Sequence, residues 1–115
     1  MTSKYRSRKI TILAPDGTLL IFDSQKEANR YVRLTILQRA GQISELRRQV
    51  RYPLIPGQRR PDGKWERGVD YIADFVYLDS EGDTVVEDAK GFRTPEYIIK
   101  RKLMLHIHSI AVMEV

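Results

Sequence analysis

An aspartate inside an apolar strand pattern is the first sign of chemistry in this chain. Asp74 lies in the run from Tyr71 to Leu78, and the alternation of side chains along a strand places it on one face with Ile72 and Val76. A carboxylate with apolar face-mates is costly to bury unless it has a partner. The position therefore predicts a functional carboxylate rather than an aspartate on an edge strand facing water.

A second acidic segment follows after a turn. Alternation puts Asp88 and Lys90 on one face with Val86, and puts Glu87 on the opposite face. Asp88 and Lys90 could be a solvated ion pair, but their place beside an apolar strand favours a functional role. Glu87, on the other face, is interpreted as structural.

The turn between these strands decides whether the two aspartates meet. If the loop has an odd number of residues, either 80–82 or 79–83, Asp74 faces Asp88 on the neighbouring strand. Like charges that face each other across a strand pair are destabilising. Protonation of one carboxyl, a raised pKa of the pair, or a bound cation could offset the repulsion, and a divalent ion suits oxygen ligands at that separation.

The composition restricts which cation and which substrate are plausible. The chain has no cysteine and only two histidines, His106 and His108, so a metal would be held mainly by oxygen. A net charge of +5 among 115 residues favours a polyanionic partner such as nucleic acid. Phosphodiester hydrolysis needs these catalytic groups: a cation held by carboxylates and a lysine beside it to orient water.

The elements that position these residues follow from turn formers, caps and periodicity. We expect one α/β domain over residues 1–115, with a basic tail at 1–8, no disulfide, no membrane segment and no signal peptide, and therefore a cytoplasmic location. The predicted elements are a hairpin of strands 10–13 and 18–22, a helix at 25–40, a strand at 44–54, a mobile basic loop at 56–68, strands at 70–78 and 84–90, a helix from 95 to about 106, and a final parallel strand at 109–115.

Glu27 lies in the first turn of the first predicted helix. It lies three residues after the N-cap Ser24, so a capping box explains it without any chemistry. A role beside the two aspartates is the alternative.

The pattern of Asp74 followed by Asp88-Ala89-Lys90 in a hairpin, after a helix bearing Glu27, resembles the PD-(D/E)XK nuclease superfamily, whose core is also αβββαβ. Ala73 and Asp88 depart from the commoner proline and glutamate of that motif. The size and spacing look like Holliday junction resolvases of archaeal and phage type, and several segments resemble an uncharacterised family of phage proteins.

The resemblance implies a mixed-sheet, restriction-endonuclease-like fold and a Mg²⁺-dependent endonuclease, with Mn²⁺ able to substitute and no small-molecule cofactor. The implied partners are four-way DNA junctions and a second copy of the chain, acting in the cytoplasm of a phage host. The implied catalytic residues are Glu27, Asp74, Asp88 and Lys90, and the implied metal ligands are the three carboxylates and the backbone carbonyl of Ala89.

Cationic residues near such a site are candidates for contacts with phosphates, although a basic run can simply be solvated. Trp65 could pack on the domain or stack on a base. Gln49 resembles a polar residue that resolvase-like nucleases place beside the metal, and Lys100 a phosphate contact. The full DNA-binding set expected is Arg47, Arg48, Gln49, Arg51, Arg59, Arg60, Lys64, Arg67 and Lys100.

The sequence leaves three hypotheses about the function of the protein. The first is a junction-resolving endonuclease. The second is another nuclease of the same fold, such as a nicking or restriction-like enzyme. The third is a DNA-binding phage protein without catalytic activity.

Overall fold

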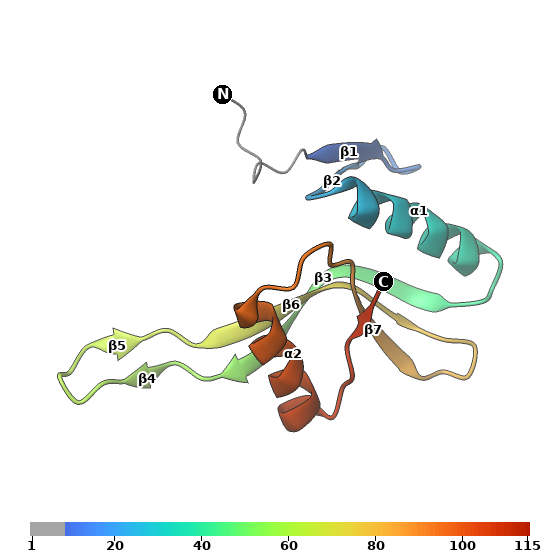
Figure 1. Ribbon diagram of the computed structural model, residues 1–115. Coiled ribbons are helices and arrows are strands. Elements are labelled where there is room, and N and C mark those ends of the chain that lie inside the picture. The colour runs from blue at the N-terminus through green and yellow to red at the C-terminus, as the bar shows by residue number, and fades with distance from the viewer. Residues whose placement is uncertain (1–8) are drawn as a thin grey trace.

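The computed structural model describes residues 9–115, and it is a mixed α and β fold with two helices (Figure 1). A four-stranded mixed sheet forms its centre, and two separate two-stranded hairpins are attached to it. The elements are β1 Ile10–Leu13, β2 Leu19–Phe22, α1 Gln25–Arg39, β3 Ser44–Ile55, β4 Gln58–Arg59, β5 Trp65–Glu66, β6 Val69–Leu78, β7 Thr84–Asp88, α2 Pro95–His108 and β8 Met113–Glu114.

Both helices begin and end where their caps place them. The Ser24 hydroxyl accepts a hydrogen bond from the Glu27 N–H at 3.1 Å, which confirms the capping contact at the start of α1. The Thr94 hydroxyl caps α2 in the same way, with Pro95 in the first turn. Gly41 follows α1 with a φ of 76°, a left-handed conformation that glycine adopts without steric cost.

The central sheet has the order β3-β6-β7-β8. The first three strands are antiparallel, and β8 lies parallel to β7 after the crossover through α2, as expected. The hairpin of β6 and β7 pairs Val76 with Val86 and Leu78 with Thr84. This is the register that an odd-numbered loop predicts.

Two hydrophobic clusters hold the helices against the sheet. Tyr97 and Met104 of α2 pack with Tyr71, Ala73 and other residues of the sheet. The other cluster joins Phe22, Ala28 and Leu34, from the first hairpin and α1, to Ile43, Phe75 and Tyr77. The sheet is therefore the frame on which α1 and α2 are placed.

Four expectations about the elements need correction. Strand β7 ends at Asp88, so Lys90 lies beyond the strand. Strand β8 contains only two residues, because Ser109 takes a left-handed conformation and ends α2 late. Ile72 is 43% exposed, so the face that it was expected to share with Asp74 is not uniformly buried.

The fourth correction concerns residues 56–68. They contain a β-hairpin, β4 and β5, rather than a loop without regular structure. This hairpin extends the β3–β6 pair away from the body of the molecule (Figure 1). Within residues 9–115, no helix is long and apolar enough to cross a membrane.

Candidate functional site

The predicted carboxylates gather where β6 and β7 separate. The β6–β7 ladder ends at the pair of Phe75 with Glu87, so the next positions on the two strands are Asp74 and Asp88. Beyond this point the chain turns toward α2, and the Ala89 N–H donates a hydrogen bond to Asp74 Oδ2 at 2.8 Å. The hairpin therefore brings both aspartates to one end of the strand pair.

Asp74 is partly buried and close to other charges. Burial raises its pKa, and the Asp88 carboxylate adds to this rise, while the Ala89 N–H and Lys90 oppose it. A cation placed at these two carboxylates would remove their repulsion.

Asp88 has an uncompensated oxygen. The residue is 1% exposed, and the Tyr71 hydroxyl donates a hydrogen bond to Oδ2 at 2.5 Å. Oδ1 is buried and accepts no hydrogen bond in the described part of the chain. The Lys90 Nζ lies 3.7 Å from Oδ1, close enough for an ion pair but too far for a hydrogen bond. A buried carboxylate oxygen of this kind needs a further partner.

Glu27 approaches Asp74 through an intervening amide. Gln49 Nε2 lies 3.2 Å from Glu27 Oε1 and 3.4 Å from Asp74 Oδ1. Gln49 has a φ of 52°, which is unusual and strained for a residue other than glycine. The strain at this point of β3 is consistent with a functional placement of the amide.

Glu27 is 5% exposed. Burial raises the pKa of its carboxyl to about 6, helped by Asp74 and Asp23 and opposed by Arg48. A capping box explains the backbone of Glu27 but not this position of its carboxylate. The structure thus brings together Glu27, Gln49 and Asp74, with Asp88 and Lys90 on the other side of Asp74.

Arg48 does not lie in a solvated basic run. Its guanidinium carbon lies 4.0 Å from the centre of the Phe22 ring, its Nη2 donates to the Ile21 carbonyl, and the same Nη2 lies 3.7 Å from Glu27 Oε1. Arg48 therefore joins the first hairpin to the site and is not placed to bind phosphate.

An ion pair that no sequence pattern revealed lies beneath the site. Glu87 is fully buried, and Arg30 donates to both of its carboxylate oxygens, at 2.8 and 2.6 Å. Tyr77 donates to the same carboxylate. Burial of the Tyr77 hydroxyl and this hydrogen bond together raise the pKa of Tyr77 to about 12. Arg30 is one helical turn after Glu27, so this pair fixes α1 where Glu27 reaches Gln49. In the sequence, Glu87 shares its strand face with Val85 and Ala89, and a glutamate on such an apolar face indicates a cationic partner.

A hollow of about 270 Å³ opens beside Asp88 and Lys90. Tyr97 of α2 forms part of its wall, and the Lys90 Nζ lies 4.9 Å from the centre of that ring. Lys100 also lines the hollow, as its predicted role requires, although it is paired with Glu96 at 3.2 Å. The remaining lining residues are Tyr71, Ile72, Thr94 and Glu96.

The other predicted DNA contacts lie at different places on the surface. Arg47 is exposed on β3, and Arg51 pairs with Asp70 at 2.7 Å. The remaining four are exposed on or beside the β4–β5 hairpin: Arg59, Arg60, Lys64 and Arg67.

The carboxylate oxygens of the site can supply some, but not all, of the ligands of a hard divalent cation. Among residues 9–115, no three His, Asp or Glu side chains are grouped closely enough to form a ready cage. Mg²⁺ does not require such a cage, since it keeps several waters and is bound through one or two carboxylates. Asp74 and Asp88 supply those carboxylates, and Asp88 Oδ1 has a free lone pair. The residues present therefore fit Mg²⁺ with water as its remaining ligands.

Comparison with known proteins finds one family. Its model, described as a protein of unknown function (DUF1064), matches residues 2–112. The chain belongs to the DUF1064 family. No curated protein and no solved structure matches it. For this DUF1064 protein, the side chains around Asp74 and Asp88 are thus the basis for assigning a function.

Proposed function

We propose that this protein is a metal-dependent DNA endonuclease with a restriction-endonuclease-like αβββαβ core, centred on Asp74, Asp88 and Lys90. The observation that carries the proposal is the buried Oδ1 of Asp88, which has no hydrogen-bond partner among residues 9–115 and lies 3.7 Å from the Lys90 Nζ. A protein gains nothing in stability from such a group, so a functional partner is the physical explanation.

Each residue has a role in this proposal that its contacts support. Asp74 and Asp88 would hold Mg²⁺, or Mn²⁺ in its place, together with the Ala89 carbonyl. When bound, the ion would polarise the phosphate and lower the pKa of its water. Lys90 is 36% exposed at its side chain and flanks the hollow, so it can orient a water or stabilise charge developing on the phosphate.

Glu27 and Gln49 complete the other side of the site. Gln49 places an amide donor between the carboxylates of Glu27 and Asp74. This contact keeps the two acidic groups from facing each other directly. Glu27 would act on the water ligands of the ion rather than at the phosphate.

The substrate that the proposal favours is a four-way DNA junction. The net charge of +5 and the exposed arginines and lysines suit a DNA backbone. Resolving a junction requires two matched cuts, and the described chain offers one such centre. The working unit would therefore be a symmetric homodimer.

The runner-up is another nuclease of the same fold that nicks or cuts simple duplex. The central residues would be the same, and the substrate alone would differ. A DNA-binding protein without catalytic activity is disfavoured by the intact set of Asp74, Asp88 and Lys90.

Incubation with labelled four-way junction, duplex and single strand tests the proposal. We expect cleavage of the junction in Mg²⁺ and none in chelator. Preferred cutting of simple duplex would support the runner-up. Binding of DNA without cleavage of any substrate in Mg²⁺ or Mn²⁺ would contradict the nuclease assignment.

A further inference from the structure

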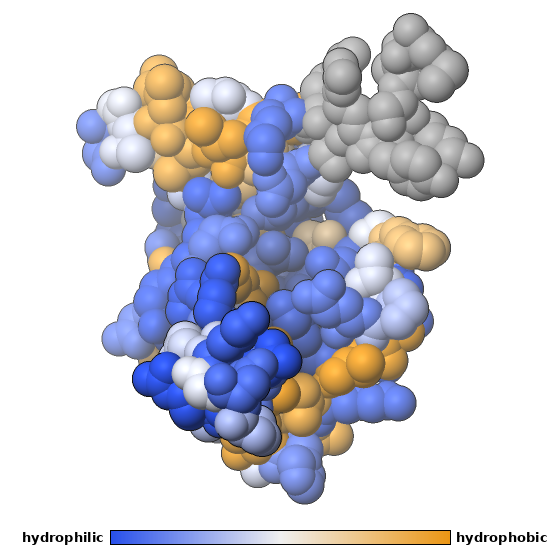
Figure 2. Space-filling view, turned by 90° about the vertical axis from the view of Figure 1, so that its left-hand side faces the viewer, coloured by the Kyte–Doolittle hydropathy of each residue, from blue (hydrophilic) through white to orange (hydrophobic). Residues whose placement is uncertain are grey.

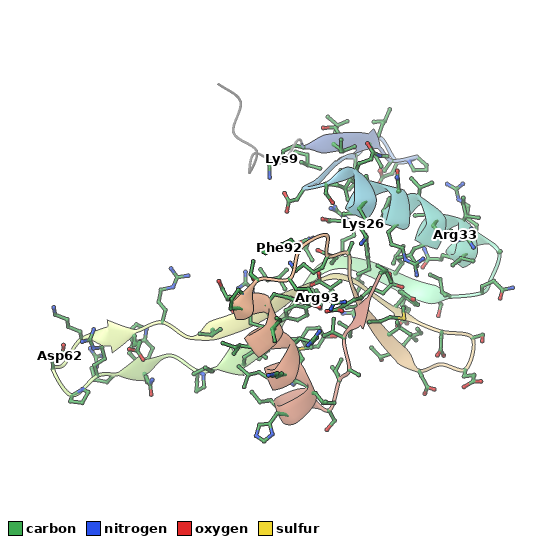
Figure 3. All side chains as sticks on the ribbon, in the orientation of Figure 1. Lys9, Lys26, Arg33, Asp62, Phe92 and Arg93 are labelled. Carbon is green, nitrogen blue, oxygen red and sulfur yellow. The ribbon has the colours of Figure 1, made fainter. Side chains whose placement is uncertain are left out.

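Residues 56–68 form a built projection, which we call the arm. Strands β4 and β5 pair Gln58 with Glu66 and Arg59 with Trp65. The arm continues the β3–β6 pair beyond the body of the molecule, and Asp62 marks its tip (Figure 3). Among the described residues, neither β4 nor β5 contributes to the two hydrophobic clusters, so the arm adds little to the core and its shape needs another explanation.

The arm is braced along its own length. The Arg60 N–H donates to the Lys64 carbonyl at 2.8 Å, and Asp62 Oδ1 accepts from the Lys64 N–H at 3.1 Å. The Gln58 amide donates to the Glu66 carboxylate at 2.8 Å. These bonds define a ribbon of fixed geometry rather than a loose loop.

Two glycines allow the close approaches at the base of the arm. A Cβ on Gly68 would lie 2.5 Å from the Ile55 carbonyl oxygen, and one on Gly57 would lie 2.5 Å from the Trp65 ring. Trp65 therefore rests on Gly57, with its other side 5.5 Å from the Arg59 guanidinium. The ring packs against the ribbon at Gly57 and remains 60% exposed.

The surface of the arm is cationic and hydrophilic. Seen end-on, the arm projects toward the viewer as a mostly hydrophilic knob (Figure 2). Arg60 pairs with Asp62 at 3.2 Å. Within residues 9–115, neither Lys64 nor Arg67 has a carboxylate partner, and both are exposed.

Two neighbouring hollows lie between the site and the base of the arm. A cavity of about 310 Å³ there is lined by Arg51, Arg67 and other residues. It shares Ile72, Glu96 and Lys100 with the hollow beside Asp88 and Lys90. A polyanion that entered the site would therefore pass Lys100 and then meet the arm.

We propose that the arm lies in the major groove of the duplex that flanks the cleavage site, with Lys64 and Arg67 on its phosphates. The major groove of B-DNA admits a two-stranded β-ribbon, which favours duplex over single-stranded DNA as the partner. The inference rests on the proposed function for the position of the cut, but its binding test does not require cleavage.

The length of β3 gives the distance. From Gln49 beside Asp74, eight residues lead to Gly57 at the base of the arm and thirteen to Asp62 at its tip. At about 3.3 Å per residue these are roughly 26 and 43 Å. At about 3.4 Å per base pair, the arm would reach duplex roughly 8 to 13 base pairs from the cut.

The single tryptophan of the chain makes the inference measurable, because Trp65 lies in the arm. Four-way junctions would be prepared with hairpin-closed duplex arms of about 6 or about 16 base pairs and titrated into wild-type protein in chelator. Binding would be measured by gel mobility and the environment of Trp65 by its fluorescence. We expect Trp65 emission to change with the long-armed junction and not with the short-armed one, although both bind.

A charge-matched pair of variants tests the cationic contacts. K64Q/R67Q should bind the long-armed junction more weakly, with the slope of log affinity against log salt reduced by about 2, because each phosphate contact contributes about 0.9. Its affinity for the short-armed junction should equal that of the wild type. R33Q/R39Q removes the same charge from α1, and Figure 3 shows Arg33 far from the arm. We expect this control to keep the wild-type dependence on arm length.

Four results would overturn the inference. One is an equal change in Trp65 emission with both junctions. Another is an equal change with single-stranded DNA, which would make the arm a single-strand site. The third is unchanged emission when the long-armed junction binds, and this would leave the nuclease proposal intact. Absence of binding to any DNA would refute both the arm inference and the proposed function.

Discussion

The unusual residues of this protein are its buried acids. In the described part of the chain, Asp88 has an oxygen without a hydrogen-bond partner, and burial raises the pKa of both Asp74 and Glu27. Each arrangement costs folding free energy in the absence of a cation. The cost is concentrated at one end of the β6–β7 hairpin, which is what a site built to receive a cation requires.

The Glu27 carboxyl should make stability depend on pH. Its pKa is raised from 4.5 to about 6, so the folded state binds more protons than the unfolded state between these values. Stability from this group is therefore complete below about pH 4.5 and is lost as pH rises through 6. A rise of about 1.5 units corresponds to roughly 2 kcal/mol.

Urea denaturation of wild type and Glu27→Gln in chelator measures this effect. The stability of the wild type relative to Glu27→Gln should fall by roughly 2 kcal/mol between pH 4 and pH 7.5. Mg²⁺ at pH 7.5 should recover part of this loss in the wild type. A relative stability that does not vary with pH would show that Glu27 is not buried as a charge.

At the scale of elements, the ion pair of Arg30 with the buried Glu87 helps to hold helix α1 at the site. Arg30→Ala would leave the Glu87 carboxylate buried with Tyr77 alone, and losing one partner of such a pair costs about 3 kcal/mol or more. We expect a loss of about 3 kcal/mol in urea denaturation. Arg33→Ala on the exposed face of the same helix should change stability by less than about 0.5 kcal/mol.

The double variant Arg30→Met with Glu87→Met separates pairing from packing. Removing both charges should restore much of the stability that Arg30→Ala loses, because no uncompensated charge remains. If the double variant were as unstable as Arg30→Ala, the loss would be due to packing of the arginine side chain and not to the ion pair.

Sequence periodicity was informative about elements whose signals are local. The odd-numbered loop predicted that Val76 pairs with Val86, and caps predicted the starts of both helices. The arm could not be predicted because its strands have two residues each and are extensions of β3 and β6. The Arg30–Glu87 pair joins residues 57 positions apart, a contact that no local pattern encodes.

The same limit applies within the candidate site. Strand alternation correctly set Glu87 apart from Asp88, and it set Asp74 opposite Asp88. It did not foresee the left-handed Gln49, whose amide links Glu27 to Asp74, or the packing of Arg48 on Phe22. Both depend on where α1 and the first hairpin lie in space.

At the scale of the whole molecule, the first hairpin exposes apolar side chains that are not packed into the core. Leu13, Leu19 and Ile21 are 67%, 64% and 59% exposed. Apolar surface of this kind marks interaction sites. Since two cuts require two sites, we expect a homodimer in which this hairpin contributes to the interface.

Light scattering over a range of concentrations checks this expectation. The wild type should be a dimer at micromolar concentration, and Leu19→Glu should shift it toward monomer without unfolding it. Ile99→Glu, at a similarly exposed position on α2, serves as the control. A wild type that stays monomeric even on junction DNA would leave the nicking nuclease as the surviving alternative.

The cleavage rate of Asp88→Asn tests the central claim most directly. Wild type, Asp88→Asn and Asp83→Asn would be compared on labelled junction in Mg²⁺ under single-turnover conditions, since Asp83 is an exposed aspartate in the loop of the same hairpin. The account predicts cleavage by wild type and Asp83→Asn at similar rates. Asp88→Asn should show no detectable cleavage, with DNA binding equal or tighter because a negative charge near phosphate is removed. Cleavage by Asp88→Asn at the wild-type rate would contradict the account.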